Sequence, residues 1–233
     1  MYRGQDIGNR EQLIEKCLEI LRTGNEEDRY KVLPHMSVTR SAQFLEPLLE
    51  MLDSGELRDK EFAALALGAL GNPAAVKPLF AFFRETDLFL NDENRQLETA
   101  LIFALGEIGD ESAVDLLFEV YDMRFPGKVA SNSRKRSVLS ALGMLAQQGC
   151  DRAVEKIMGL ALCDGLEMQV QAVNELSVAY WHRVNQVPDS VLQVMVKLSE
   201  SQREELQKAA VTALSTLANL GCTKAESYFS ASS

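Results

Sequence analysis

The chain has 233 residues, 46% hydrophobic and 25% charged, a composition typical of a protein with a substantial hydrophobic core. Its 34 acidic residues outnumber its 24 basic ones, which gives a net charge of -10 at pH 7. This excess argues against nucleic acid as a partner, because phosphate binding needs a surplus of lysine and arginine. No apolar run is long enough for a transmembrane helix, so we expect no membrane association.

The N-terminus and the cysteines indicate the compartment in which the chain works. The first residues are mostly polar and contain no apolar signal segment. The four cysteines stand at positions 17, 150, 163 and 222, without a C-x-x-C spacing. We therefore expect free thiols and a reducing, cytoplasmic location.

Hydrophobic residues recur at helical spacing from one end of the chain to the other. A cap helix is expected over residues 10–23 and ends at Gly24. Pro34 should kink or shorten the helix that follows the cap helix. A later helix is expected from Glu167 to Arg183. Polar connectors are expected at 87–93 and 124–132. Six helical pairs follow the cap helix, at approximately residues 26–54, 57–86, 94–123, 132–163, 167–200 and 203–230.

One stretch of the sequence occurs twice. Residues 62–79 read FAALALGALGNPAAVKPL, and residues 100–117 read ALIFALGEIGDESAVDLL, 38 residues later. Self-similarity at such a period is typical of repeat proteins. The alanines and glycines within each first helix should let neighbouring helices approach closely, and the Gly-Asn or Gly-Asp pair should form the turn. These features predict an all-α fold, a single right-handed α-solenoid of about six helical hairpins.

The repeated motif is Ala-Leu-Gly-x-(Leu/Ile)-Gly-(Asn/Asp)-x-x-Ala-Val-x-x-Leu, at 66–79 and 104–117. It resembles the short HEAT-like repeats named after the phycobilisome lyases, and weaker copies extend the resemblance over nearly the whole chain. The resemblance implies an armadillo-type or HEAT-like superhelix. Proteins with such repeats include bilin lyase subunits, phycobilisome-degradation factors, escorts of iron–sulfur assembly factors, deoxyhypusine hydroxylase and many scaffolds.

The histidines exclude one of these activities. Deoxyhypusine hydroxylase uses several His-Glu dipeptides to hold two iron ions. Here His35 is followed by Met36 and His182 by Arg183, so no His-Glu dipeptide is present. Neither histidine has further ligands at helical spacing, and we expect no metal site.

The leading functional hypothesis is a non-enzymatic scaffold or adaptor without a cofactor, which binds a protein partner on its concave face. The resemblance implies that the second helix of each pair lines that face. The outward positions of these helices are mainly acidic, which would suit a partner with a basic or helical segment. They are Glu46, Glu50, Lys77, Arg84, Asp115, Glu119, Asp122 and Glu155.

Two further clusters could contact a ligand or a partner. Tyr180-Trp181-His182-Arg183 contains the single tryptophan, and such residues are frequent binding hot spots, although they could equally fill a gap in a divergent repeat. Arg134-Lys135-Arg136 could meet a phosphate or an acidic partner, or form the solvated first turn of a helix.

Two alternative functions remain open. One is a bilin lyase or isomerase subunit, or a phycobilisome-degradation factor, with a bilin as ligand. The other is an escort of iron–sulfur assembly factors. For the latter, Cys150 and Cys222 each follow a glycine in a turn that could expose the thiol, whereas Cys17 and Cys163 are expected to be packed.

Overall fold

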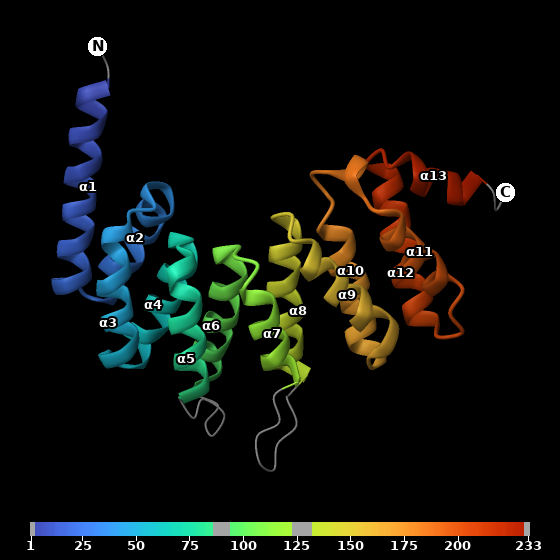
Figure 1. Cartoon of the computed structure of the whole chain (residues 1–233), viewed down its shortest axis with the longest axis horizontal. Coiled ribbons are helices and arrows are strands. Elements are labelled where there is room, and N and C mark those ends of the chain that lie inside the picture. Colours follow the sequence, from blue (N-terminus) through green and yellow to red (C-terminus); the bar gives the residue numbers. More distant parts are fainter. Residues whose placement is uncertain (1–2, 86–93, 123–131, 231–233) are drawn as a thin grey trace. The chain divides into compact units, whose positions relative to one another are not determined.

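The protein is built from helices alone in the part of the chain that the computed structural model describes, which is residues 3–85, 94–122 and 132–230 (Figure 1). The predicted all-α repeat fold is confirmed. The chain divides into two compact units, Met1–Leu116 and Leu117–Ser233, and the division falls within the helix α7. Within the described residues, no helix is both long and apolar enough to cross a membrane.

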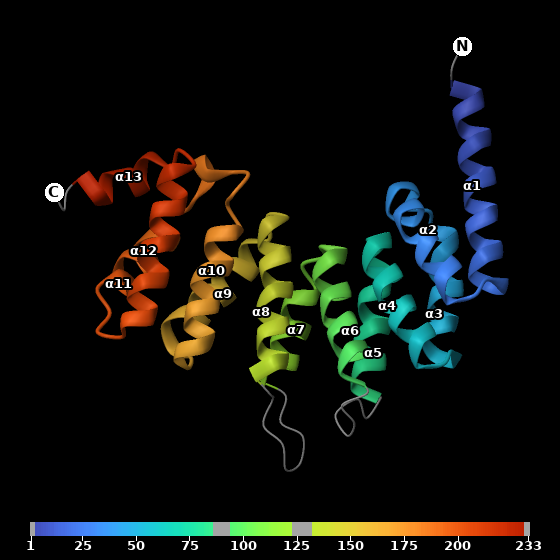
Figure 2. The same ribbon diagram turned by 180° about the vertical axis from the view of Figure 1, so that it is seen from behind.

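The first unit begins with a long helix and continues with helical pairs. The first helices α2, α4 and α6 pack on one another in sequence, and the second helices α3 and α5 pack on the first helix of the next pair; α4 and α6 lie side by side in both Figure 1 and Figure 2. Its helices are α1 (Arg3–Thr23), α2 (Glu26–Thr39), α3 (Leu45–Ser54), α4 (Leu57–Leu70), α5 (Val76–Glu85), α6 (Arg95–Ile108) and the start of α7 (Ala113–Asp122).

The small residues of the repeated motif bring α4 and α6 close together. Gly68, Ala66 and Ala104 are all buried. A Cβ added to Gly68 would lie 2.9 Å from the Cα of Ala104 and 2.6 Å from the Glu107 Oε2. Real Cβ atoms do not approach backbone atoms this closely, so a glycine is needed here. The predicted close approach of the first helices is confirmed at this contact.

The turns inside the pairs follow the predicted chemistry. Gly71 ends α4 with a φ of 64°, a left-handed conformation that costs glycine little, and Asn72 accepts a hydrogen bond from the Ala74 backbone N–H at 3.0 Å. Pro73 then stands at the first position of the next turn. Glycines at the three corresponding turns, Gly109, Gly149 and Gly221, also have positive φ angles.

The second unit repeats the arrangement. Its first helices α8, α10 and α12 pack in sequence, and each also packs on the second helix of its own pair or of a neighbouring pair. Leu142, Val173 and Leu214 lie at the centre of this packing and are fully buried. The helices are α8 (Asn132–Gln147), α9 (Asp151–Cys163), α10 (Leu166–Val178), α11 (Asp189–Ser199), α12 (Glu204–Asn219) and α13 (Thr223–Ser230).

Three helix boundaries differ from those expected. α1 begins at Arg3 rather than near residue 10, and α2 continues past Pro34 to Thr39. The helix expected to reach Arg183 ends at Val178, and the following residues form tighter turns, in which the Trp181 N–H donates to the Val178 carbonyl. Arg183 itself has a non-helical backbone with φ -145° and ψ 43°. The connectors at 87–93 and 124–131 lie outside the described residues.

Candidate functional site

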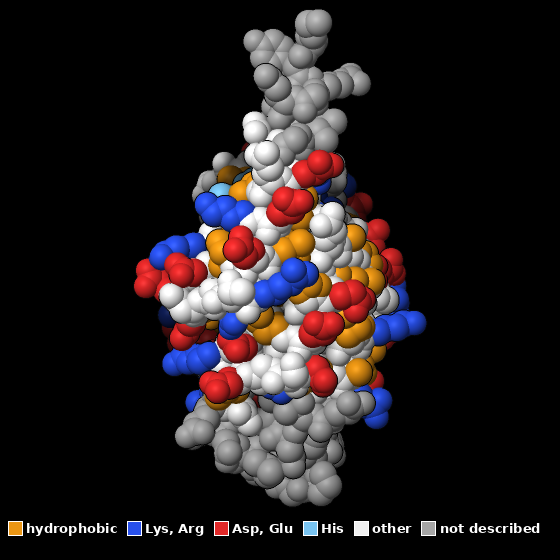
Figure 3. Space-filling model, turned by 90° about the vertical axis from the view of Figure 1, so that its left-hand side faces the viewer, with side chains coloured by type: hydrophobic (Ala, Val, Ile, Leu, Met, Phe, Trp, Pro, Cys, Tyr) orange, Lys and Arg blue, Asp and Glu red, His pale blue; other side chains and the backbone are white. Residues whose placement is uncertain are grey.

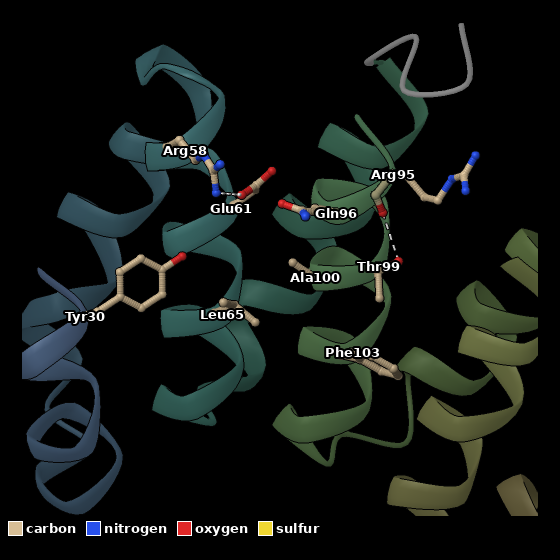
Figure 4. A pocket seen from close by; sticks show the side chains of 9 residues that line it. All are labelled: Tyr30, Arg58, Glu61, Leu65, Arg95, Gln96, Thr99, Ala100 and Phe103. Atoms are coloured by element: carbon tan, nitrogen blue, oxygen red, sulfur yellow. Dashed lines mark hydrogen bonds and ion pairs between the residues drawn. The ribbon is translucent and has the colours of Figure 1, made fainter. Parts of the chain in front are cut away.

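A groove crosses three first helices of the first unit and has a volume of about 390 Å³ (Figure 4). Its floor is apolar, with Leu65 from α4 and Ala100 and Phe103 from α6. Tyr30 from α2 forms one wall and packs edge-on against Phe62, with ring centroids 5.3 Å apart. The remaining lining residues are polar: Arg58, Glu61, Arg95, Gln96 and Thr99.

The groove exists because α4 and α6 are close at one end and carry larger side chains at the other. The helices meet at Gly68 and Ala104, where no side chain separates them. One and two turns earlier, α4 presents Leu65 and Glu61 instead. Figure 4 shows the side chains of Glu61 and Gln96 pointing toward one another from α4 and α6. The tight contact thus closes one end of an apolar groove.

The electrostatics of the groove centre on Glu61. Its side chain is 8% exposed and forms an ion pair with the Arg58 Nη1 at 3.7 Å, while the Arg58 side chain is 66% exposed. Burial raises the pKa of the Tyr30 phenol, and the carboxylates of Glu61 and Glu26 raise it further, against an opposing effect of Arg58. The groove therefore combines an apolar floor with one acid, Glu61, and two arginines, Arg58 and Arg95.

The family comparison concerns the neighbouring part of the chain. The model of the PBS lyase HEAT-like repeat matches residues 99–121, from the second half of α6 through the Gly109 turn into α7. The chain carries a PBS lyase HEAT-like repeat. A search of curated proteins finds no match. The predicted resemblance is confirmed, and the HEAT-like repeat contributes Thr99, Ala100 and Phe103 to the groove.

The eight positions that were predicted to bind a partner, on the second helices of the pairs, are all exposed. None of them lines the groove, which lies among first helices. Exposure is a requirement for partner binding, and that role stays a prediction. The eight residues are Glu46, Glu50, Lys77, Arg84, Asp115, Glu119, Asp122 and Glu155.

Two of these positions face a second hollow in the first unit. Glu46 and Glu50 of α3 line a cavity of about 400 Å³ together with Arg22 and Arg29. Arg29 is bound to Asp59 through its Nη1. Seen from the side of α1, acidic and basic side chains are interspersed with exposed hydrophobic ones (Figure 3). Since Asp59 already pairs with Arg29, Arg22 alone of the described lining residues is left against Glu46 and Glu50, and the acidic surface predicted here is only partly neutralised.

The basic cluster at 134–136 does not form a single cationic patch. Arg134 is 8% exposed, and the Lys135 Nζ lies 4.6 Å from the centre of the Tyr121 ring and 3.8 Å from the Asp164 Oδ2. Arg136 pairs with Glu167 at 3.5 Å. The three residues lie at the start of α8, as one of the two interpretations expects, and their binding to a phosphate or an acidic partner stays a prediction.

The Tyr180–Arg183 cluster is also divided. Tyr180 is 1% exposed, and the Arg183 guanidinium lies 4.8 Å from its ring centre and donates a hydrogen bond to the Ala146 carbonyl of α8. Trp181 is 50% exposed and His182 is exposed. Arg183 thus links two successive pairs and is half-buried, while Trp181 and His182 are the exposed members of the cluster.

Two of the four cysteine predictions are reversed. Cys17 is buried as expected and Cys150 is half-buried, but Cys163 is exposed and Cys222 is buried. Cys163 is the last residue of α9, where the packed face ends at Ala161. The Cys222 N–H donates to the Leu217 carbonyl at 2.9 Å, and the Cys150 N–H donates equivalently to the Leu145 carbonyl at 3.0 Å, so the two turns share a backbone geometry but differ in the burial of the thiol. Within the described ranges, no group of three or more His, Cys, Asp and Glu side chains could hold a metal ion.

The groove was missed by sequence analysis, although one signal was present. Thr99 and Phe103 stand 38 residues after Glu61 and Leu65, at equivalent positions of the two copies. The copies therefore differ in charge and size at two positions that face the same groove. A comparison of the first helices, rather than the second, would have found them.

Proposed function

We propose that this chain is a non-enzymatic scaffold that binds a segment of a protein partner in the groove formed by α2, α4 and α6. The PBS lyase HEAT-like repeat supports the scaffold part of the proposal, since solenoids of helical pairs offer extended binding surfaces. The groove supports the location. The groove is lined mainly by apolar surface, whereas the hollow beside the second helix α3 is lined about equally by polar and apolar surface.

The apolar floor of the groove carries the proposal. Leu65, Ala100 and Phe103 form a stripe across two neighbouring helices, flanked by polar side chains. A partner segment that buries an apolar side chain there gains about 1.5–3 kcal/mol for that residue. Polar groups at the rim would then fix its orientation, as in other complexes in which a groove between helices accepts a peptide.

A hollow in the second unit is a weaker candidate. It has a volume of about 530 Å³ and is lined by residues of α11 and α13, including Leu192 and Val196. Lys197 and Glu200 also line it, and its other two charged residues, Asp189 and Lys224, bind each other at 2.5 Å. Since this ion pair satisfies both charges, a partner gains little from meeting either of them.

Partner capture with matched variants tests the proposal. Thr99→Trp places an indole in the groove, and Ala81→Trp places the same side chain on the exposed surface of α5. We expect proteins captured from a lysate by the unmodified chain and by Ala81→Trp to be lost with Thr99→Trp. Both variants should unfold at nearly the temperature of the parent chain.

A third variant distinguishes the two surfaces. Reversing charge at Glu119 and Asp122, which are exposed on α7, should leave the captured partner unchanged. Loss of the partner with this charge reversal, together with retention by Thr99→Trp, would move the binding site to the second helices.

A further inference from the structure

The charges that line the groove differ in how far they reach into solvent. Two arginines, Arg58 and Arg95, line it together with one acid, Glu61. The Arg58 side chain is 66% exposed, whereas the Glu61 side chain is 8% exposed, and Arg95 is exposed as well. A ligand that enters the groove therefore meets arginines first, although the whole chain carries a net charge of -10.

Both arginines lie at one end of the groove. Arg58 is the second residue of α4, and Arg95 is the first residue of α6. Figure 4 shows them on opposite sides of this end, with Leu65 and Phe103 further along the two helices. Because α4 and α6 both begin here, the positive ends of their dipoles add to the charge of the arginines. The groove is thus cationic at one end and apolar at the other.

The acids near this end leave its positive character in place. Asp59 is paired with Arg29, and both line the separate cavity beside α3. Glu26 lies near the wall that α2 forms, rather than between α4 and α6. Glu61 meets a single Arg58 nitrogen, Nη1, at 3.7 Å, which is longer than a hydrogen bond. A guanidinium carries five N–H donors, so Arg58 retains donors that a ligand can use.

The corresponding junction of the second unit is bridged by hydrogen bonds. Between its first helices α8 and α10, Ser140 donates to Glu175 at 2.8 Å and Gln171 donates to the Arg136 carbonyl at 2.9 Å. Ser140 stands three residues before the glycine of the Ala-Leu-Gly motif, and Leu65 occupies the same place in α4. The apolar side chain at this position cannot form such a bridge, so the α4–α6 junction presents apolar surface instead.

A ligand that matches both ends of the groove carries an anion close to an apolar group. A carboxylate accepts two parallel hydrogen bonds from a guanidinium, which makes it the protein group best suited to Arg58. Seven residues separate Arg58 from Leu65, a rise of about 10 Å along α4. An extended segment covers that distance in about three residues.

We propose that the groove selects a partner segment in which an aspartate or glutamate lies within about three residues of a bulky apolar residue. The carboxylate binds at the end of the groove that carries Arg58 and Arg95, and the apolar side chain packs on Leu65, Ala100 and Phe103. This inference rests on the proposed function, since it assumes that a protein segment enters the groove. The partner is opposite in charge to the basic one that the sequence predicts for the second helices.

Peptide selection provides the test. A library of random 12-residue peptides displayed on phage is selected against the parent chain. The selected peptides should lose binding to Thr99→Trp and should be enriched in aspartate or glutamate within about three positions of an apolar residue. Their affinity for the double variant Arg58→Gln/Arg95→Gln should be about 3- to 10-fold weaker, between the effects of an exposed ion pair and of a hydrogen bond to a charged group. The control Arg84→Gln, at an exposed arginine of α5, should bind them like the parent chain.

A change in the peptide separates charge from packing without altering the protein. Replacing the selected glutamate by glutamine, or aspartate by asparagine, keeps the shape of the side chain and removes its charge. The replacement should weaken binding to the parent chain by a similar factor and should have little further effect on binding to Arg58→Gln/Arg95→Gln. Circular dichroism melting should show that the double variant unfolds near the temperature of the parent, because both replaced side chains are exposed.

The possible failures are distinct. Peptides that Thr99→Trp excludes, but that show no enrichment in acids and bind equally well after their acid is neutralised, would overturn the selection by the arginines and leave the proposed function standing. Enrichment in lysine or arginine would overturn it in the same way. If no peptide is selected, or none of those selected is excluded by Thr99→Trp, the groove is not a peptide site and both proposals are wrong.

Discussion

The packing of α4 against α6 predicts an unusual response to the substitution Gly68→Ala. In most helix interiors, replacing glycine by alanine increases the free energy of unfolding by up to about 1 kcal/mol, because alanine has the higher helix propensity. At Gly68 the added methyl group would lie 2.9 Å from the Ala104 Cα, which belongs to the backbone of α6 and cannot rotate away.

The two effects can be compared in magnitude. Overpacking in a well-packed interior costs about 1–3 kcal/mol, and a backbone contact favours the upper part of that range. The Glu107 Oε2, at 2.6 Å from the added methyl group, belongs to a flexible side chain and can move at lower cost. Subtracting the gain in helix propensity leaves a net destabilisation of about 1–2 kcal/mol.

Gly159 is the matched control. It lies in the interior of α9 and is exposed, and a Cβ added there would have no atom within 4 Å. Gly159→Ala should therefore stabilise the chain by up to about 1 kcal/mol. Urea unfolding followed by circular dichroism measures both variants. Equal stabilisation by the two substitutions would refute the close packing of α4 and α6.

Three other predictions concern the second unit. Burial and the hydrogen bond to Asp164 raise the pKa of the Tyr121 phenol, so ultraviolet titration should show that Tyr121 ionises at a higher pH than a free tyrosine. The protonated phenol therefore stabilises the fold below its unfolded-state pKa near 10, and this contribution is lost as pH rises through the folded-state pKa. Tyr121→Phe should lower the free energy of unfolding by about 1–2 kcal/mol in urea at pH 7. Burial raises the pKa of Glu175, although hydrogen bonds from Ser140 and Gln171 act in the opposite direction. Ionisation of Glu175 therefore destabilises the folded state as pH rises. Glu175→Gln should increase the free energy of unfolding at pH 7 relative to the parent, and should not increase it below pH 4. Arg183→Ala should lower the free energy of unfolding by about 0.5–1.5 kcal/mol, because the Ala146 carbonyl of α8 loses one of its two donors and keeps the Gly149 N–H. Trp181→Ala should change it by less than about 0.5 kcal/mol, because Trp181 is half exposed.

Much of the fold could be predicted from the sequence because its determinants are local. The Gly71-Asn72 turn needs a residue that tolerates positive φ and a side chain that caps the next turn. Two adjacent residues of the sequence, a glycine and an asparagine, supply both. Gly68 was recognisable as a contact residue because its copies recur at a fixed period.

The candidate site was harder to predict because it depends on contacts between repeats. Tyr180 and Arg183 resemble a binding cluster in sequence, but Arg183 is held by the Ala146 carbonyl, 37 residues earlier in the chain. The Cys163 and Cys222 predictions failed for a related reason. Whether a residue at a helix end faces inward depends on a rotation of a fraction of a turn, which hydrophobic periodicity does not determine.

The groove depends on geometry that neither copy of the repeat contains alone. Glu61 and Leu65 lie on one helix, and Ala100 and Phe103 lie on the next. Each pair fits the pattern of an ordinary helix face. Only the separation of α4 and α6 on this side of the Gly68 contact turns the two faces into a groove.

Site-specific photo-crosslinking tests the central claim most directly. The photoreactive residue p-benzoylphenylalanine is placed at Thr99, in the groove, or at Glu119, on the exposed face of α7. With the captured partner, we predict an adduct at position 99 and none at position 119. An adduct at position 119 without one at position 99 would contradict the assignment of the groove as the binding surface.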